Sequence, residues 1–378
     1  MTMKFTASSA ELLKALTAVA GAVPTKSTLP ILECVLFEST KGGLRLSATD
    51  LEISIVQTLK VKFDSAGTAR DARVAVPARR LMDTLRALPD LPIAFTADEE
   101  FNVELKTDQG VYKMVGQDGA DYPSLPELKG GTKIEMGATV LRRAIQKTSF
   151  AVSKDALRPA MMGIFFQVHG SRARAVATDG HRLVKLTLND IASKENVDFI
   201  VPEKAMSLAG KVVSEGPCSV TVSEGYVGFD FGHSIVLARQ IAETYPNYEA
   251  VIPIENDRKL TINRAAMLAA TRRVGLYSST MTHQIRLSLD EGRVEISAED
   301  IERSSEAHET VLAEYEGEPM EIGFNSVYLT EVLNNADSDD VVFEFSSPNR
   351  AGIVTPARQE EGENMLMLIM PVMLNTYA

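Results

Sequence analysis

Apolar residues recur along the chain in two different rhythms. Segments with apolar residues three or four positions apart predict helices, because that spacing gathers them on one helical face. Segments in which apolar and polar residues alternate, such as Arg286 to Ser297, predict antiparallel hairpins. Six helices are predicted, at 8–20, 77–88, 138–148, 202–213, 263–274 and 325–336.

Three kinds of segment recur in the same order, which indicates an internal repeat. A strand ending in Ala-x-Asp closes at Asp50, Asp179 and Asp300, with spacings of 129 and 121 residues. A short strand then runs into a helix, and a later apolar strand leads toward a proline. The pattern predicts an α+β fold of three domains, each with two helices packed on antiparallel sheet, at residues 1–127, 128–254 and 255–378.

Composition narrows the class of protein. The first residues lack the basic and apolar segments of a secretory signal, and no apolar run is long enough for a membrane span, so a cytoplasmic protein is expected. Cys34 and Cys218 lie far apart in apolar strands and are predicted to be buried, neither a disulfide nor a metal pair. No cofactor and no metal site are predicted.

Charge is distributed unevenly between helices and the remaining chain. The whole chain carries −12, whereas the predicted helices together carry +8, which leaves −20 for everything else. A protein that meets phosphates with one face and stays acidic elsewhere needs such a separation. Solvated helix faces give the same pattern and are an equally good explanation of the charges taken alone.

The kinds of nucleic-acid binding open to the chain are limited. There is no Trp and few aromatic residues accompany the basic ones, which disfavours stacking on single strands. Neither a Cys/His zinc module nor a clear recognition helix is present. The one mode of nucleic-acid binding that these observations leave open is sequence-independent contact with the backbone of a duplex.

Two competing hypotheses are an enzyme and a monomeric, acidic interaction module. Asp179 and His181 in the Thr-Asp-Gly-His-Arg segment are the best catalytic candidates, as a base or as metal ligands. The chain has five His and lacks an HExxH motif, a phosphate-binding loop and a dinucleotide fingerprint. A loop His after Asp-Gly is more often a turn residue, so no catalytic residue is predicted.

Seven segments in order resemble the bacterial DNA polymerase III beta subunit, the DNA sliding clamp family. They are Thr-Leu-Pro-Ile-Leu at 28–32, Thr-Asp-Leu-Glu at 49–52, Val-Pro-Ala-Arg at 76–79, Val-Ala-Thr-Asp-Gly-His-Arg-Leu at 176–183, Tyr-Pro-Asn-Tyr at 245–248, Met-Glu-Ile-Gly-Phe-Asn at 320–325 and Met-Pro-Val-Met-Leu at 370–374. The resemblance implies three repeated clamp domains per chain and a head-to-tail homodimeric ring lined by helices. It implies a non-catalytic processivity factor that encircles duplex DNA and tethers the polymerase during DNA replication.

The resemblance also implies which basic residues lie near DNA. Lys26, Arg79, Lys204 and Lys211 match such positions in the family. Arg142, Arg143 and Lys147 are added on charge grounds, because they share one face of a predicted helix.

A second implied surface is a pocket for short linear peptides borne by the polymerase III catalytic subunit, the clamp loader and repair proteins. The matching residues are Met161, Thr178, Gly180, His181, Arg182, Leu183, Pro246, Val251, Met370, Pro371, Val372 and Met373. Unbranched methionines suit a groove that accepts several peptides, although a terminal Met-rich run taken alone is more often a core strand. The chain departs from the family at Glu249 and Ala250, where a basic residue is common, and in the tail 375–378, which is expected near the pocket.

The implied dimer interface joins the first domain of one chain to the third domain of another. Its predicted residues are Tyr112, Leu276 and Tyr277 as an apolar centre, with Arg80 facing Glu299 and Glu302 at a charged rim. Opposed charges of this kind set the orientation of the two chains more than their affinity.

Overall fold

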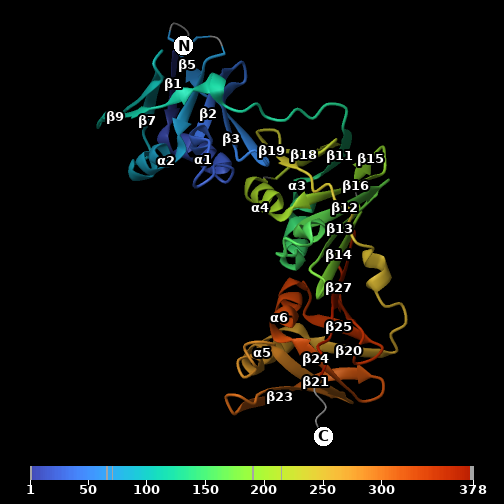
Figure 1. Ribbon diagram of the computed structural model, residues 1–378. Coiled ribbons are helices and arrows are strands. Elements are labelled where there is room, and N and C mark those ends of the chain that lie inside the picture. The colour runs from blue at the N-terminus through green and yellow to red at the C-terminus, as the bar shows by residue number, and fades with distance from the viewer. Residues whose placement is uncertain (1, 65–66, 70, 190, 214, 375–378) are drawn as a thin grey trace. The chain divides into compact units, whose positions relative to one another are not determined.

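The computed structural model describes residues 2–64, 67–69, 71–189, 191–213 and 215–374. The chain folds into two compact units (Figure 1). Unit 1 contains Met1–Arg142, Ser193–Glu195 and Lys204–Gln240. Unit 2 contains Arg143–Ala192, Asn196–Glu203 and Ile241–Ala378.

The order of helices and strands repeats three times along the chain. The first repeat is β1 (Met3–Ser8), α1 (Ser9–Ala20), β2 (Cys34–Thr40), β3 (Gly43–Thr49), β4 (Ile53–Leu59), β5 (Lys62–Phe63), β6 (Arg73–Pro77), α2 (Ala78–Ala87), β7 (Pro92–Ala97), β8 (Asn102–Lys106), β9 (Val111–Val115) and β10 (Gln117–Asp118). The second is β11 (Thr132–Gly137), α3 (Ala138–Thr148), β12 (Gly163–His169), β13 (Arg172–Thr178), β14 (Arg182–Leu188), β15 (Ala192–Ser193), β16 (Val197–Pro202), α4 (Glu203–Val212), β17 (Pro217–Ser223), β18 (Tyr226–Asp230) and β19 (Ser234–Arg239). The third is β20 (Arg258–Asn263), α5 (Arg264–Gly275), β21 (Gln284–Asp290), β22 (Arg293–Asp300), β23 (Ser305–Glu316), β24 (Met320–Asn325), α6 (Ser326–Asn335), β25 (Asp340–Phe345), β26 (Gly352–Pro356) and β27 (Glu363–Ile369).

The six predicted helices are confirmed, and each observed end lies within one residue of its prediction. Asn325 caps α6 as predicted, because its side-chain oxygen accepts hydrogen bonds from the backbone N–H groups of Val327 and Tyr328. Pro77 and Pro202 instead end the strands before α2 and α4, where a residue without a backbone N–H is tolerated.

Strands of neighbouring repeats pair directly with each other. In unit 1 a ten-stranded sheet runs β10-β6-β2-β3-β4-β19-β18-β17-β11-β15, and β4 of the first repeat pairs antiparallel with β19 of the second. In unit 2 a twelve-stranded sheet runs β16-β12-β13-β14-β27-β26-β25-β20-β23-β22-β21-β24, with β14 of the second repeat pairing with β27 of the third. Main-chain hydrogen bonds therefore make continuous sheets from consecutive repeats.

The remaining sheet of unit 1 has the order β5-β1-β7-β8-β9 and places β9 at an edge. Its core includes Phe5, Phe37 and Phe95, whose rings stack with centroids 4.6 to 6.5 Å apart.

Both cysteines are buried in strands as predicted, and burial raises the pKa of Cys34 to about 11 and that of Cys218 to about 12. The two thiols are consequently protonated at neutral pH and pack as small apolar groups.

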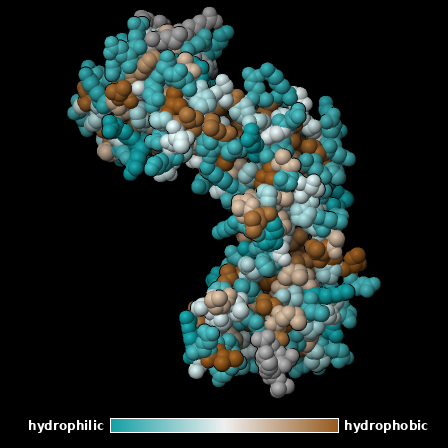
Figure 2. All heavy atoms as spheres, in the orientation of Figure 1, coloured by the Kyte–Doolittle hydropathy of each residue, from teal (hydrophilic) through white to brown (hydrophobic). Residues whose placement is uncertain are grey.

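No helix of the described residues is long and apolar enough to cross a membrane. On the face shown in Figure 2, hydrophilic residues cover most of the surface and apolar residues form small, separate groups.

Candidate binding surfaces

An apolar surface covers one face of the sheet around β12, β13, β14 and β27. The strand register places Ile200, Phe165, Val176, Lys185 and Leu366 in one row across this face. The neighbouring row contains Thr178, Leu183 and Leu368. We call this surface the outer face, because the alternate residues of the same strands, such as Val184 and Met367, are fully buried in the core.

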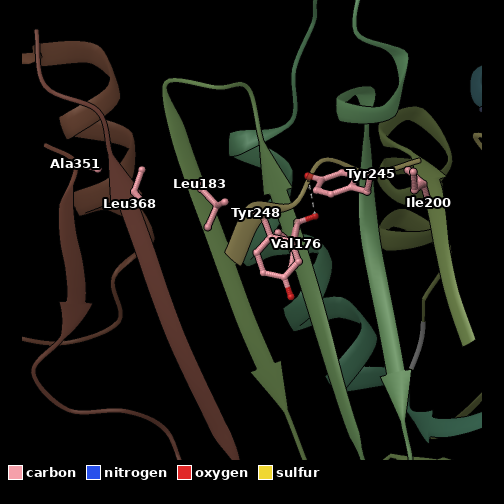
Figure 3. Close-up of a cluster of buried hydrophobic side chains, with 7 residues drawn as sticks. All are labelled: Val176, Leu183, Ile200, Tyr245, Tyr248, Ala351 and Leu368. Carbon is pink, nitrogen blue, oxygen red and sulfur yellow. Dashed lines mark hydrogen bonds between the residues drawn. The ribbon is translucent and has the colours of Figure 1, made fainter. Parts of the chain in front are cut away.

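The segment after β19 folds over part of the outer face. Tyr245 stacks on Phe165 with ring centroids 4.6 Å apart, and Tyr248 meets the same ring edge-on at 6.4 Å. The Tyr245 hydroxyl donates to the backbone oxygen of Val176 at 3.5 Å, and the Tyr248 hydroxyl donates to Oε1 of Gln167 at 2.5 Å. Figure 3 shows the two rings lying against the strands that carry Val176 and Leu183.

The predicted peptide residues are distributed over the outer face and its border. Leu183 belongs to the buried cluster, and Met161 and Thr178 are also buried. The exposed members stand at the border, where Val251 in the 3-10 helix η5 (Tyr248–Val251) is 54% exposed and Met373 is 75% exposed. Gly180, His181, Pro246 and Met370 are also exposed, whereas Pro371 and Val372 are half-buried. Sequence reasoning missed Val176, Ile200, Tyr245, Tyr248 and Leu368, which the strand register and the two tyrosines of Tyr-Pro-Asn-Tyr could have indicated.

Arg182 lies inside the fold and not at an open rim. Its guanidinium forms ion pairs with Asp179 and Glu331, donates to the backbone oxygen of Phe150 and lies 4.7 Å from the centre of the Tyr328 ring. Burial lowers the pKa of Arg182 in spite of the neighbouring Asp179 carboxylate. The residue therefore connects β14 to α6.

The Asp-Gly-His-Arg turn is built by its aspartate. Oδ1 of Asp179 accepts hydrogen bonds from the backbone N–H groups of His181 and Arg182, and Gly180 adopts φ 89°, a conformation that suits glycine. The His181 ring stacks on Tyr328. Both candidate catalytic side chains are thus used in the turn and its packing.

Glu249, where the chain departs from the family pattern, forms an ion pair with Arg174 at 2.8 Å. This pair fixes η5 to β13 at the border of the outer face. The tail 375–378, predicted to lie near the pocket, is outside the described residues.

The basic residues predicted from the resemblance lie in exposed positions. Lys26 follows α1, Arg79 lies on α2, and Lys204 and Lys211 lie on α4. Lys204 forms an ion pair with Asp50, whereas the described residues provide no ion pair for the other three.

The three basic residues added on charge grounds have partners within the chain. Arg142 donates to the backbone oxygen of Val213 at 2.7 Å, just beyond the end of α4. Arg143 pairs with Glu363 and Asp337 at 2.6 and 2.7 Å. Lys147 is buried and bonds Asp337 and the backbone oxygen of Asn335, the last residue of α6. A cation suits the end of a helix because the last carbonyl groups there lack partners. Positive charge on a predicted helix therefore did not distinguish side chains that are free to meet DNA from side chains that bind within the chain.

Comparison with known proteins identifies the family. Models of the DNA polymerase III beta subunit match in three parts: the N-terminal domain over residues 3–126, the central domain over 135–247 and the C-terminal domain over 249–372. The beta sliding clamp of Pseudomonas aeruginosa is 31% identical over 97% of this chain and 99% of that protein. The chain belongs to the DNA polymerase III beta subunit family.

Solved structures of beta subunits agree with this assignment. A sliding clamp of Pseudomonas aeruginosa bound to griselimycin has a TM-score of 0.92 at 30% identity, covering 99% of this chain and all of that one. One from Bartonella birtlesii, also bound to griselimycin, gives 0.91 at 29%, with the same coverage. The three-domain α+β fold of the beta subunit family is therefore confirmed, while the domain limits 1–127, 128–254 and 255–378 stay predictions.

The residues predicted for a beta-subunit dimer interface lie on two exposed regions. Arg80 on α2 is exposed and Tyr112 on the edge strand β9 is half-buried, in unit 1. In unit 2, Leu276 is 82% exposed at the end of α5 and is followed by the exposed Tyr277. Glu299 lies near the end of β22, and Glu302 lies in the turn between β22 and β23. Exposed large apolar residues next to charged ones are typical of a surface that another chain covers.

The Asp337 carboxylate is the centre of a small ion network in unit 2. Partial burial raises its pKa, but the hydrogen bonds and charges of Lys147 and Arg143 outweigh this and lower the pKa below its ordinary value. Such a group stabilises the fold above its ordinary pKa and loses that contribution as the pH falls through the lowered value.

Replacing Asp337 by Asn should therefore reduce the free energy of unfolding at pH 7 by about 1–2 kcal/mol. The difference from the unmodified protein should shrink as the pH falls below about 4. Urea unfolding at pH 7, 5 and 3 measures this difference in unfolding free energy. The control is Asp339→Asn, which removes a nearby exposed carboxylate. An equal difference at all three pH values would contradict the role given to the Asp337 charge.

Proposed function

We propose that this protein is a DNA sliding clamp of replication: a head-to-tail homodimeric ring that encircles duplex DNA and holds DNA polymerase III on it. Membership of the beta subunit family carries this conclusion, and its relatives bear the name of sliding clamps. As a member of that family the protein is a non-catalytic processivity factor. We propose that it acts in the cytoplasm.

The pairing between repeats supports the closed dimer. The fourth strand of the first repeat, β4, pairs with the last strand of the second, β19. The equivalent strands β14 and β27 pair between the second and third repeats. The same rule leaves β9, the strand of the first repeat equivalent to β19, and β23 of the third repeat for each other. We propose that a second copy of the chain supplies each partner in a head-to-tail arrangement.

Both strands have free edges that suit this pairing. β9 bonds β8 on one side only, and its Val111 and Val115 are exposed. β23 pairs with β22 from Ser305 to Leu312 but with β20 only from Ala313 to Glu316, so its first part is open on one side. An open strand edge presents unpaired N–H and C=O groups and is a site of association.

The two pairings within the chain also predict a register for the third. Ala238 of β19 lies opposite Ile53, and Ile369 of β27 lies opposite Arg182. Met114 of β9 is the equivalent of Ala238, because both lie opposite a buried valine of the preceding strand. Pairing Met114 with Ser305 should place Tyr112 opposite Ala307 of the second chain. Leu276 and Tyr277 would then cover the helix that carries Arg80.

Contact with DNA is proposed for Lys26, Arg79, Lys204 and Lys211. Arg142, Arg143 and Lys147 have intrachain partners and are assigned to stability instead. A few exposed cations on an otherwise acidic protein give weak, salt-dependent contacts with phosphates that read no sequence. Such contacts suit a ring that slides, because enclosure and not affinity keeps it on the duplex.

The outer face and its border are proposed as the site that binds short peptides of polymerase III. We propose the same site for peptides of the clamp loader and of repair proteins. A buried apolar floor with exposed methionine and valine at its edge can accept apolar side chains of an extended segment. The buried rings of Tyr245 and Tyr248 give the floor a fixed shape.

The dimer can be tested at the edge of β9. Val115→Lys should raise the dissociation constant at least tenfold, because an ammonium group would be buried in an apolar contact. Sedimentation velocity at micromolar concentration measures the mass, and Leu157→Lys, which changes another exposed apolar residue, should leave a dimer. A monomeric unmodified protein, or a V115K variant as dimeric as the unmodified one, contradicts the proposed interface.

Enclosure can be tested on circular DNA. After loading by its own clamp loader, the protein should remain on nicked circles through gel filtration and should leave when the circle is linearised, because a ring slides off free ends. Blocking the two ends with a tightly bound protein should restore retention. Equal retention on nicked and open linear DNA would show binding by contact, and no retention on either would favour the acidic interaction module.

The peptide site can be tested with exposed residues that the fold does not need. Val251→Asp and Met373→Asp should each weaken binding of a peptide from the polymerase about tenfold or more, since each removes apolar contact and adds a charge. Fluorescence anisotropy measures the affinity, with Leu29→Asp in unit 1 as the control. Unchanged affinity in both variants would remove this surface from the proposed function.

A further inference from the structure

One lysine stands in the middle of the apolar outer face. Lys185 on β14 lies directly opposite Val176 on β13 and Leu366 on β27. Leu183 lies two residues along the same strand, on the same face. The side chain is half-buried.

The ammonium group of Lys185 has no hydrogen bond or ion pair to any residue that the structure describes. Its cross-strand and diagonal neighbours on the face are Val176, Leu366, Leu183, Leu368, Arg174, Thr178, Thr187 and Asn364, none of which is acidic. Arg174 is paired with Glu249. Lys185 is therefore an uncompensated cation on this surface.

The sister junction shows that the position does not require a charge. The register of β3, β4 and β19 places Val56 between Ser47 and Ile235, as Lys185 is placed between Val176 and Leu366. Val56 is only 4% exposed. An apolar residue thus fits this position in the same fold, and the fold itself gives no reason for a lysine.

We propose that Lys185 recognises a carboxylate on the peptide that occupies the outer face. The inference rests on the proposed function, and it adds the chemical class of the partner segment: an extended peptide with apolar anchors and one negative charge beside them. The carboxylate can come from an acidic side chain or from the end of the partner's chain.

The physical reason is the loss of water from the ammonium group. In the free protein, a half-buried lysine can keep its ammonium group hydrated while its methylenes cover apolar surface. A peptide that covers the face removes that water, and a cation left there without an acceptor opposes binding. A carboxylate replaces the water with a charge-assisted hydrogen bond, so the same residue favours acidic segments and disfavours neutral ones.

The register also indicates where the charge belongs in the peptide. Two residues of a strand span about 7 Å, so the Lys185 stem stands about that far from Leu183. An extended peptide whose apolar anchor contacts Leu183 and Leu368 should therefore carry its carboxylate one or two residues from that anchor. Basic or neutral residues at that point are disfavoured.

Three forms of one polymerase-derived apolar peptide test the proposal. The first carries Glu beside the anchor and an amidated end, the second carries Gln and a free terminal carboxylate after the last anchor, and the third carries Gln and an amide. Anisotropy is measured with the unmodified protein, with Lys185→Gln and with Lys259→Gln, which removes an exposed lysine from β20 in the same unit.

The unmodified protein and K259Q should bind one carboxylate form about five-fold or more tightly than the neutral form, and K185Q should lose this preference. The form that K185Q ceases to prefer identifies the source of the carboxylate. K185Q should bind the neutral peptide at least as well as the unmodified protein does, which a merely unfolded variant would not.

Two outcomes overturn the proposal. One is equal binding of all three peptides by the unmodified protein, and the other is a carboxylate preference that K185Q retains. Both leave the peptide site of the proposed function standing, whereas absence of binding by every peptide would remove that site together with the inference.

Discussion

The structure depends on antiparallel hydrogen bonding between the edge strands of consecutive repeats. An edge strand left open carries unpaired N–H and C=O groups, and three repeats in a row would leave several such edges. Pairing β4 with β19 and β14 with β27 removes four of them and makes each junction as rigid as the interior of a sheet. The same rule leaves β9 and β23, which gives the chain a reason to assemble with a second copy.

The two junctions within the chain have the same backbone but different surfaces. At the first, Ser47 and Ser54 occupy the places that Val176 and Leu183 hold at the second, and the Thr49 and Ser54 hydroxyls bond each other at 2.8 Å. A hydroxyl pair satisfied within the sheet offers little to an apolar ligand. A repeated fold can therefore present an apolar surface at one junction and not at the other.

The basic residues on and next to the helices lie in two distinct settings. Lys147 and Arg142 bind the carbonyl groups at the ends of α6 and α4, and Arg143 holds Glu363 and Asp337. Lys26, Arg79 and Lys211 remain exposed and lack ion pairs among the described residues. A cation near a helix end or a carboxylate is held in place, whereas an isolated one is available to a phosphate.

The sequence by itself determined the six helices, the threefold repeat and the family, because periodic apolar residues and ordered motifs are local properties of a chain. It also grouped Thr178 and Leu183 in one predicted site, and both lie on the outer face. Only the tertiary structure decided which strands of different repeats pair, that Arg182 is buried against Tyr328, and that Lys185 faces Val176 and Leu366. These facts depend on register between segments far apart in sequence, and a shift of one residue would turn every side chain to the other face.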